Sequence, residues 1–481
     1  MRMKYLNGLM LPAVWALLSA CTVGPDYVRP KALPAIPATY KEVEGWKPAR
    51  PGGEVIGEKW WELFNDPQLN VLEEQVVVAN QDVVAAEARF RQARALVQSA
   101  KAGYYPTVSL GASVTNSRAS ATMGGGNRSD STVYSLPLDA SWEADIWGRI
   151  RRSVESSSAG AQASAADLAA VRLSAQASLA QAYFQLRSND AQLALLKETV
   201  GNYQKSLDLT RNRYGSGVAA RSDVLQAETQ LKSTQAQAVD LGVQRAQLEH
   251  AIALLIGTTP AGFSLPAAAL ATQPPPIPVG IPSELLERRP DIAVAERNMA
   301  SANAQIGVAV AAWYPTLKLS LSGGLESSSL SRWLSWPSRF WSVGPSVSET
   351  LYDGGLRSAL NDQARAAYDA TVAAYRQAVL TGFQEVEDNL AALRILEQEA
   401  QVQDEAVAAS RQTVAVTSNQ YRAGVVSYLN VLVAQTAELA NRRVAIDISG
   451  RRLVAGVLLI KALGGGWDAA GILSDSSPEK P

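Results

Sequence analysis

The sequence contains almost no cysteine and almost no histidine. Its 481 residues include one of each, Cys21 and His250. A single cysteine excludes an intrachain disulfide, so packing alone must stabilise the fold. Cysteine and histidine are also the usual ligands of transition metals. A metal site of that kind is therefore nearly excluded, and we expect none.

Net charge, long apolar runs and catalytic groupings are missing as well. Basic residues number 44 and acidic residues 45, which leaves a net charge of −1 and no basic patch for nucleic acid. Beyond the N-terminus, no stretch reaches the roughly 18 apolar residues of a transmembrane helix. Serines lack a partner histidine and carboxylates are scattered over helix faces, so we do not expect an enzyme.

The N-terminus has the features of a secretory signal peptide over residues 1–20. A positively charged start precedes an apolar core over residues 9–18, and small residues stand just before Cys21. Cleavage there would make the sole cysteine the new N-terminal residue. This position favours a modified cysteine over an inert buried thiol.

The rest of the chain is a tandem duplication. Tyr105-Pro106-Thr107 matches Tyr314-Pro315-Thr316, and NRYGSGVAARSDVLQAE (212–228) matches NQYRAGVVSYLNVLVAQ (419–435). Gly257 and Gly464 close the two copies. Several anchors in one order indicate a true internal repeat. Each copy predicts a helix, a strand, a loop, a strand, a very long helix, a turn and a return helix.

The strands are predicted from a period of two. Apolar residues alternate with small polar ones at about 104–117 and 132–145, and again at about 314–326 and 340–351. Aromatic residues gather at the strand ends, as in transmembrane barrels. A half-buried sheet of a soluble domain would alternate in the same way. Four strands cannot close a barrel, which needs about 8, and lipid does not tolerate open edges, so the membrane interpretation requires several chains.

The long helices and the turns between them carry clearer patterns. No proline occurs between residue 147 and about 213, which predicts a helix on the order of 100 Å long. Apolar heptads in the second copy predict coiled-coil packing, and the many small residues suit a helical wall. Gly217 and Gly424 stand where a tight reversal needs positive φ. Ser222 is the expected N-cap of the first return helix, with Asp223 in its first turn.

At this point the chain resembles a known family. CTVGPDYVRP after LSAC, WWELFNDPQL (60–69), LLERRPDIAVAE (285–296) and the paired Tyr-Pro strand starts are similar to the TolC-like outer membrane factors, in particular the NodT-type efflux lipoproteins. The resemblance implies a homotrimer with a 12-stranded outer-membrane β-barrel, continued by a 12-helix periplasmic α-barrel. It implies a passive exit duct for drugs or other toxic solutes, docked onto a periplasmic adaptor and an inner-membrane pump of the RND type. The alternative is a lipid-anchored periplasmic coiled-coil scaffold without a pore.

The resemblance also divides the chain. LSAC is similar to a lipobox, which implies a covalent lipid on Cys21, no other cofactor, and a lipid-anchored place in the outer membrane reaching into the periplasm. The expected parts are a signal peptide (1–20), a lipidated N-terminal segment (21–68), a first repeat with its turn at 214–222 (69–257), a Pro-rich connector (258–282), a second repeat with its turn at 421–429 (283–464) and a C-terminal tail (465–481).

A periplasmic gate is implied at the two turns. In the family pattern, an aspartate of the first turn is held by a tyrosine before the second turn's glycine and by an arginine after it. The tyrosine is Tyr421 here, and the aspartate is Asp223. Val426 replaces that arginine, which leaves Arg422 or Arg221 as substitutes. Constricting aspartates of the family fall at Asn430 and Val433, so an acidic ring is not expected. Tyr214 and Asn430 complete the implied gate, and the implied adaptor contacts are Gly217, Val218, Ala219, Gly424, Val425 and Ser427.

Overall fold

The computed structural model describes residues 22–37, 39–42, 57–118, 120, 130–270, 274–277 and 285–468. The expected signal peptide and the lipidation site at Cys21 lie outside the described residues. The chain forms two compact units, each built from segments of both repeats. One comprises residues 1–31, 90–164 and 295–375, and holds the strands; we call it the strand unit. The other comprises residues 32–89, 165–294 and 376–481, and holds both helical turns; we call it the helix unit.

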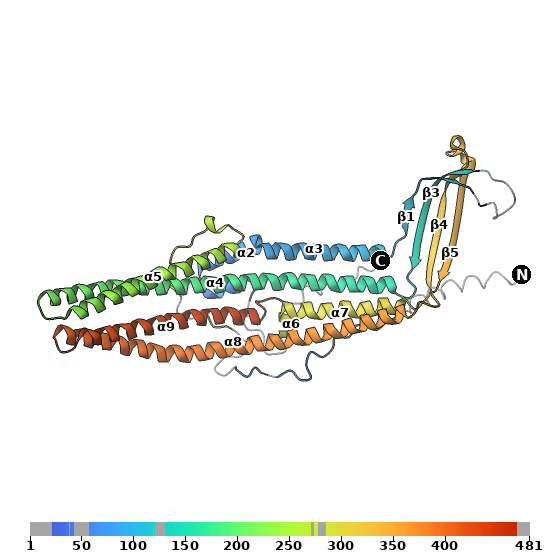
Figure 1. The fold of residues 1–481 in the computed structure, drawn as a ribbon. Helices are drawn as coiled ribbons and strands as arrows, with labels where there is room; N and C mark the ends of the chain where they lie inside the picture. The colour runs from blue at the N-terminus through green and yellow to red at the C-terminus, as the bar shows by residue number, and fades with distance from the viewer. Residues whose placement is uncertain are drawn as a thin grey trace. The chain divides into compact units, whose positions relative to one another are not determined.

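The order of elements confirms the duplication (Figure 1). The long helices α4 and α8 have 67 residues each, and the return helices α5 and α9 have 35 each. The first copy contains α2 (Pro67–Ala79), α3 (Gln81–Ala102), β1 (Thr107–Leu110), β2 (Ser113–Ser117), β3 (Ser131–Ala144), α4 (Arg149–Gly215) and α5 (Arg221–Leu255). The second contains α6 (Leu285–Arg288), α7 (Pro290–Ala311), β4 (Thr316–Ser327), β5 (Arg339–Ser348), α8 (Leu356–Arg422) and α9 (Tyr428–Ala462). Within the described part of the chain, no helix is both long and apolar enough to cross a bilayer.

The strands form one antiparallel sheet in the order β1-β3-β4-β5, with β2 also on β3. The first strand was expected as one piece from about 104, but it begins at Thr107 and is divided in two. Both pieces keep the same register on β3, and the break lies opposite Pro137. Proline has no N–H to give to the ladder, so only the bond from Gly111 N–H to the Pro137 carbonyl (2.9 Å) forms there.

The two faces of this sheet differ in polarity along the middle of the strands. Register places Val108, Ala140, Leu321 and Val343 in one row across the four strand lines. The next row, on the other face, is Ser109, Asp139, Ser322 and Ser342. The apolar face is open in a single chain, where Trp341 is 76% exposed. Period-two alternation therefore sorts the side chains as the sequence predicts.

The main core lies in the helix unit, among α2, α4, α5, α8 and α9. Its largest buried side chains include Trp60, Leu69 and Phe184. One side of α4 is covered by α2 and the connector, because the Arg187 guanidinium donates to the Pro266 carbonyl (2.8 Å) and to Gln68 Oε1 (2.6 Å). Tyr183 on the same side donates to Asp66 (2.6 Å), which caps α2.

Glu73 of α2 is fully buried in this unit, and neither carboxylate oxygen has a hydrogen-bond partner among the described residues. Burial raises the pKa of the Glu73 carboxyl well above its usual value. A raised folded-state pKa gives stability that is complete below the unfolded pKa and is lost as pH rises through the folded value.

We therefore expect Glu73→Gln to raise the melting temperature at neutral and alkaline pH, and to do so less near pH 4. Thermal unfolding of the detergent-solubilised protein across this pH range measures the effect. The control is Glu74→Gln, because Glu74 is exposed and pairs with Lys59 at the surface (2.9 Å). Equal pH profiles for the Glu73→Gln variant and the unmodified protein would contradict the prediction.

Candidate functional site: the two helical turns

The turns that join α4 to α5 and α8 to α9 have the same backbone geometry. In the first, Val218 N–H donates to the Arg213 carbonyl (2.9 Å) and Gly217 N–H to that of Tyr214 (2.9 Å). In the second, Val425 N–H donates to Gln420 (2.9 Å) and Gly424 N–H to Tyr421 (3.0 Å). These are Schellman motifs, and the glycines have φ of 76° and 79°. The prediction of positive φ at Gly217 and Gly424 is confirmed.

The helix cap after the first turn differs from the expectation. Ser222 was predicted as the N-cap of α5, but the helix begins at Arg221 and Ala220 is the N-cap, without a side-chain cap. The prediction for Ser222 is wrong because the Schellman turn closes earlier than the Ser-Asp pattern suggested. Ser427 is the N-cap of α9, and its hydroxyl accepts a long hydrogen bond from Asn430 Nδ2 (3.4 Å) rather than from the backbone.

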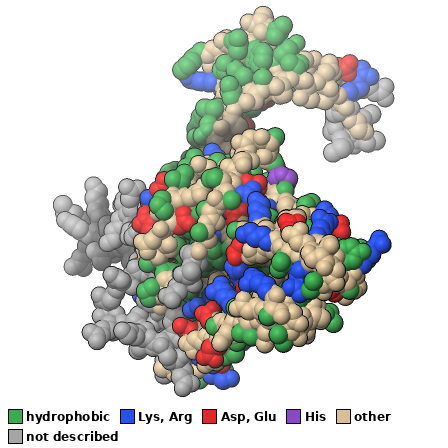
Figure 2. All heavy atoms as spheres, turned by 90° about the vertical axis from the view of Figure 1, so that its left-hand side faces the viewer, with side chains coloured by type: hydrophobic (Ala, Val, Ile, Leu, Met, Phe, Trp, Pro, Cys, Tyr) green, Lys and Arg blue, Asp and Glu red, His purple; other side chains and the backbone are tan. Residues whose placement is uncertain are grey.

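The turns present small and apolar groups to solvent. Val425 is 73% exposed, Val218 is similarly open, and both glycines are exposed, whereas Ala219 is half-buried. Basic residues flank these groups, since Arg211, Arg221 and Arg422 are all exposed. Figure 2, which views the side of the molecule at the left of Figure 1, shows Lys and Arg side chains gathered across it. The turns therefore expose glycine backbone and valine methyl groups, with basic residues beside them.

Beneath the turns lies a small core of tyrosines. Tyr421 and Tyr428 are buried and meet edge to face, with ring centroids 5.6 Å apart. Tyr203 packs in the same cluster and donates to the Gln435 carbonyl (3.4 Å). Burial raises the pKa of Tyr428 to about 12 and also raises that of Tyr203. The phenols of Tyr428 and Tyr203 therefore stay neutral at physiological pH. The cluster as a whole joins α4, α8 and α9 by packing.

The expected pair of Tyr421 and Asp223 is not formed within one chain. The Tyr421 hydroxyl donates to Thr210 Oγ1 (3.4 Å), and among the described residues the Asp223 carboxylate makes no hydrogen bond or ion pair. Tyr214, the repeat counterpart of Tyr421, is 47% exposed, whereas Tyr421 is 5% exposed. Asn430 is exposed beside the second turn.

Arg213 is the residue at these turns that the sequence did not single out. Its Nη1 donates to the Arg422 carbonyl (3.0 Å), and its guanidinium carbon lies 4.9 Å from the centre of the Tyr421 ring. The two expected substitutes behave differently. Arg422 bonds Asn419 within its own helix (2.9 Å), and Arg221 has no hydrogen bond or ion pair among the described residues. The one sequence feature that could have pointed to Arg213 is a difference between the repeats, because the second repeat has Gln420 at the equivalent position.

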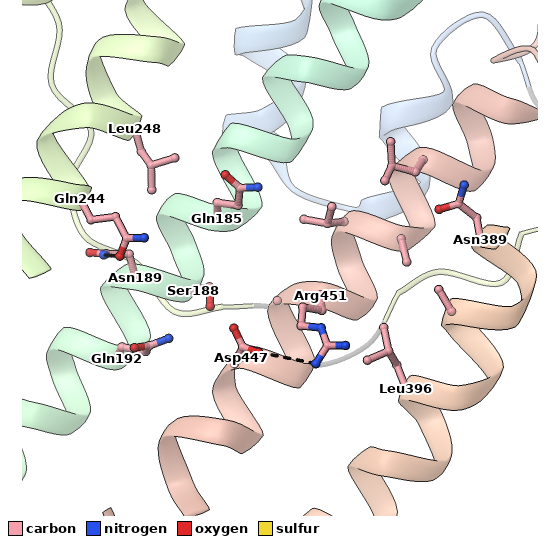
Figure 3. Close-up of a pocket in the computed structure, with 15 residues that line it drawn as sticks. Gln185, Ser188, Asn189, Gln192, Gln244, Leu248, Asn389, Leu396, Asp447 and Arg451 are labelled. Carbon is pink, nitrogen blue, oxygen red and sulfur yellow. Dashed lines mark hydrogen bonds and ion pairs between the residues drawn. The ribbon is translucent and has the colours of Figure 1, made fainter. Parts of the chain in front are cut away.

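A pocket of about 460 Å³ opens between α4, α5, α8 and α9 in the helix unit (Figure 3). The residues of α4 that line it include Gln185, Ser188 and Gln192. Each precedes by two positions a residue on the connector side of the helix, namely Arg187, Asp190 and Ala194. At 3.6 residues per turn, that step places the pocket on nearly the opposite side of α4 from the connector. Asp447 and Arg451 form an ion pair along its edge (3.8 Å). Within the described residues, no group of three or more His, Cys, Asp or Glu is placed to hold a metal.

Comparison with known proteins gives a consistent result. The family described as outer membrane efflux protein matches residues 72–258 and 281–465, one match for each repeat. The probable efflux pump outer membrane protein TtgC of Pseudomonas putida is 31% identical over 463 residues, covering 95% of both chains. The cation efflux system protein CusC of Escherichia coli is 30% identical over 466 residues, covering 95% of this chain and 98% of the relative. The solved outer-membrane channel OprN is 34% identical with a TM-score of 0.87, covering 93% of this chain and 100% of that one.

Proposed function

Because the chain belongs to the outer membrane efflux protein family, we propose that it works as a passive exit duct built from three copies. It is an outer membrane channel component of a tripartite efflux system, and it has the tandem-duplicated TolC-like fold. The partners that we propose are a periplasmic adaptor and an inner-membrane pump of the RND type. The pump supplies the energy, and this chain supplies the route through the outer membrane.

The sheet supports the trimer. Among the residues that the structure describes, a single chain leaves the β1/β2 edge and the β5 edge unpaired, and its apolar face is exposed. Lipid requires every backbone group to be paired, so the edges must meet those of other chains. Three copies of four strand lines give the 12-stranded barrel that the sequence resemblance implies. Its apolar rows would then contact lipid, and its serine-rich rows would line the bore. This polarity is the observation that favours a duct over a coiled-coil scaffold.

The turns are proposed as the periplasmic gate and as the surface that the adaptor contacts. Gly217, Val218, Gly424 and Val425 expose backbone and methyl groups at the turns, next to the buried tyrosine core. A partner that binds these groups can therefore alter the packing of α4 against α8 and α9. Cys21 is proposed as the site of a covalent lipid, which gives the barrel a second attachment to the membrane.

The cargo is proposed to be broad. Relatives of nearly equal identity are named for antibiotic, toluene and cation efflux. Such different solutes suit a duct whose wall offers amides and hydroxyls rather than one charge. The pocket face carries Gln185, Gln192 and Gln244 together with the Asp447–Arg451 pair. We propose that this face of the helices lines the bore, because the connector covers the other.

A cysteine label tests both the pore and this orientation. In Gln185→Cys the new thiol is expected to be the only one that can react, because the proposed lipid blocks the thiol of Cys21. A bulky thiol reagent should lower the single-channel conductance of the purified trimer in a planar bilayer. The matched control is Ala268→Cys, an exposed position in the connector, where labelling should leave the conductance unchanged.

Two outcomes would contradict the proposal. A protein that folds as a trimer but gives no conductance would favour the pore-free scaffold. Equal block after labelling at both positions would instead overturn the assignment of the pocket face to the bore, while leaving the duct itself in place.

A further inference from the structure

We propose that Arg213 is the latch that joins the two helical hairpins of each chain at their turns. The inference rests on the proposed function of the turns as a gate, and it identifies the residue that positions one hairpin against the other. Arg213 belongs to the last turn of α4 in the first hairpin. Both groups that it contacts, the Arg422 carbonyl and the Tyr421 ring, belong to the last turn of α8 in the second.

The two contacts of the guanidinium reinforce each other. The last carbonyls of a helix have no partner within it and carry the negative end of the helix dipole. Arg422 ends α8, so its carbonyl is such a group, and the Arg213 Nη1–H reaches it at 3.0 Å. The face of the Tyr421 ring, 4.9 Å away, attracts the same cation. A short polar side chain at position 213 could not make both contacts.

The internal repeat does not duplicate the latch: the arginine occurs only in the first hairpin, and its acceptor and ring only in the second. The positions equivalent to Arg213, Tyr421 and Tyr428 in the opposite copy are Gln420, Tyr214 and Arg221. Tyr214 and Arg221 are exposed, whereas Tyr421 and Tyr428 are buried. The two hairpins have the same backbone, but one supplies the cation and the other supplies the acceptor and the ring. At the last turns of α4 and α8, Arg213 therefore supplies the charged link between the hairpins, beside the packing of the tyrosine core.

The latch also replaces the arginine link of the family pattern, which this chain lacks. Val426 stands where the resemblance expects an arginine, and the Asp223 carboxylate is unpaired within the described residues. Arg213 approaches the second turn from the other hairpin and uses a backbone carbonyl in place of a carboxylate. Its Nε–H is buried without a partner among the described residues. That unmet donor weakens the joined state, so a modest push at the turns can release it.

The test compares Arg213→Gln with Arg211→Gln. Glutamine is the residue that the second repeat carries at the equivalent position, so it suits the local helix. Arg211 lies two residues earlier, is exposed and pairs with Glu228 of its own hairpin (3.5 Å), so its variant removes the same charge without touching the latch. We expect Arg213→Gln to shift the ratio of open to closed turns by about tenfold, as loss of one hydrogen bond and one cation–π contact predicts. The readouts are open probability in planar bilayers and cell entry of an antibiotic too large for porins.

Arg213→Lys gives a second arm, because it keeps the charge but loses the planar fork. It should fall between the unmodified protein and Arg213→Gln, and it carries the test if Arg213→Gln fails to form trimers. A trimeric Arg213→Gln or Arg213→Lys with unchanged open probability would overturn the latch, as would equal opening by Arg211→Gln. Absence of conductance in the unmodified trimer would instead refute the duct.

Discussion

Leu321→Arg is expected to abolish assembly of the chain in the outer membrane. Leu321 lies in the middle of β4, between Ala140 and Val343 in the apolar row, and is 48% exposed in a single chain. An arginine on the lipid face of a barrel near its midplane costs about 2–4 kcal/mol. The proposed trimer would carry three of them in one belt. The combined penalty exceeds what a barrel assembled from separate chains can absorb, because edge pairing and insertion must occur together.

The neighbouring residue provides the control. Ser322 follows Leu321 on β4 and lies on the opposite face, in the row with Asp139 and Ser342. Ser322→Arg should therefore assemble, since its side chain would enter the aqueous bore. Outer-membrane fractionation and the trimer band on an unheated gel measure both variants. If both variants gave trimer yields close to that of the unmodified protein, the apolar face would not meet lipid. Equal loss of trimer in both would show that the sheet tolerates no arginine on either side.

The strands illustrate what local sequence can predict. Alternation at a period of two is a property of neighbouring residues, so it fixed both the existence of the strands and the face that each side chain takes. The division of the first strand was not foreseen because its cause lies in another strand. Pro137 of β3 interrupts the ladder opposite Gly111, and only the register places those two residues together.

The gate shows the same limit more sharply. Gly217 and Gly424 were predicted because a Schellman turn needs positive φ at one residue, whatever surrounds it. Arg213 was missed because its partners lie about two hundred residues further along the chain, and nothing near Arg213 indicates that contact. The family pattern pointed to Asp223 for Tyr421, whereas within one chain the tyrosine hydroxyl meets Thr210. Burial separates Tyr421 from Tyr214, and identical repeat positions cannot reveal that difference.

The junctions at the other ends of the return helices repeat with high fidelity. In the first copy Asn80 Nδ2 donates to the Leu255 carbonyl (2.8 Å), and in the second Arg289 Nη1 donates to the equivalent Ala462 carbonyl (3.0 Å). The next turn in each copy has a glycine with positive φ, Gly257 and Gly464. Different side chains thus serve one junction, which ties each return helix to the short helix that begins its repeat.

This junction gives the second large prediction, for Gly464→Ala. The φ of Gly464 is 98°, and a Cβ there would lie 1.9 Å from the Arg288 carbonyl oxygen. A methyl group cannot occupy that place unless one of the two backbone segments moves. We expect the conformational penalty of about 1–3 kcal/mol for positive φ, and a further loss of similar size from the displaced packing. The free energy of unfolding should therefore fall by several kcal/mol.

Gly424→Ala separates the two causes. Gly424 has nearly the same kind of backbone, with a φ of 79°, but the nearest atom to its Cβ is a guanidinium nitrogen at 4.0 Å. Its variant carries only that same conformational penalty, about 1–3 kcal/mol, without the loss from displaced packing. Chemical unfolding of the solubilised protein, followed by circular dichroism, compares them. Equal losses would mean that the carbonyl of Arg288 yields readily and that the junction is not rigid. A much larger loss for Gly464→Ala would mean that α9 ends against a fixed backbone segment at Arg288, which holds this end of the helix in place when its other end moves.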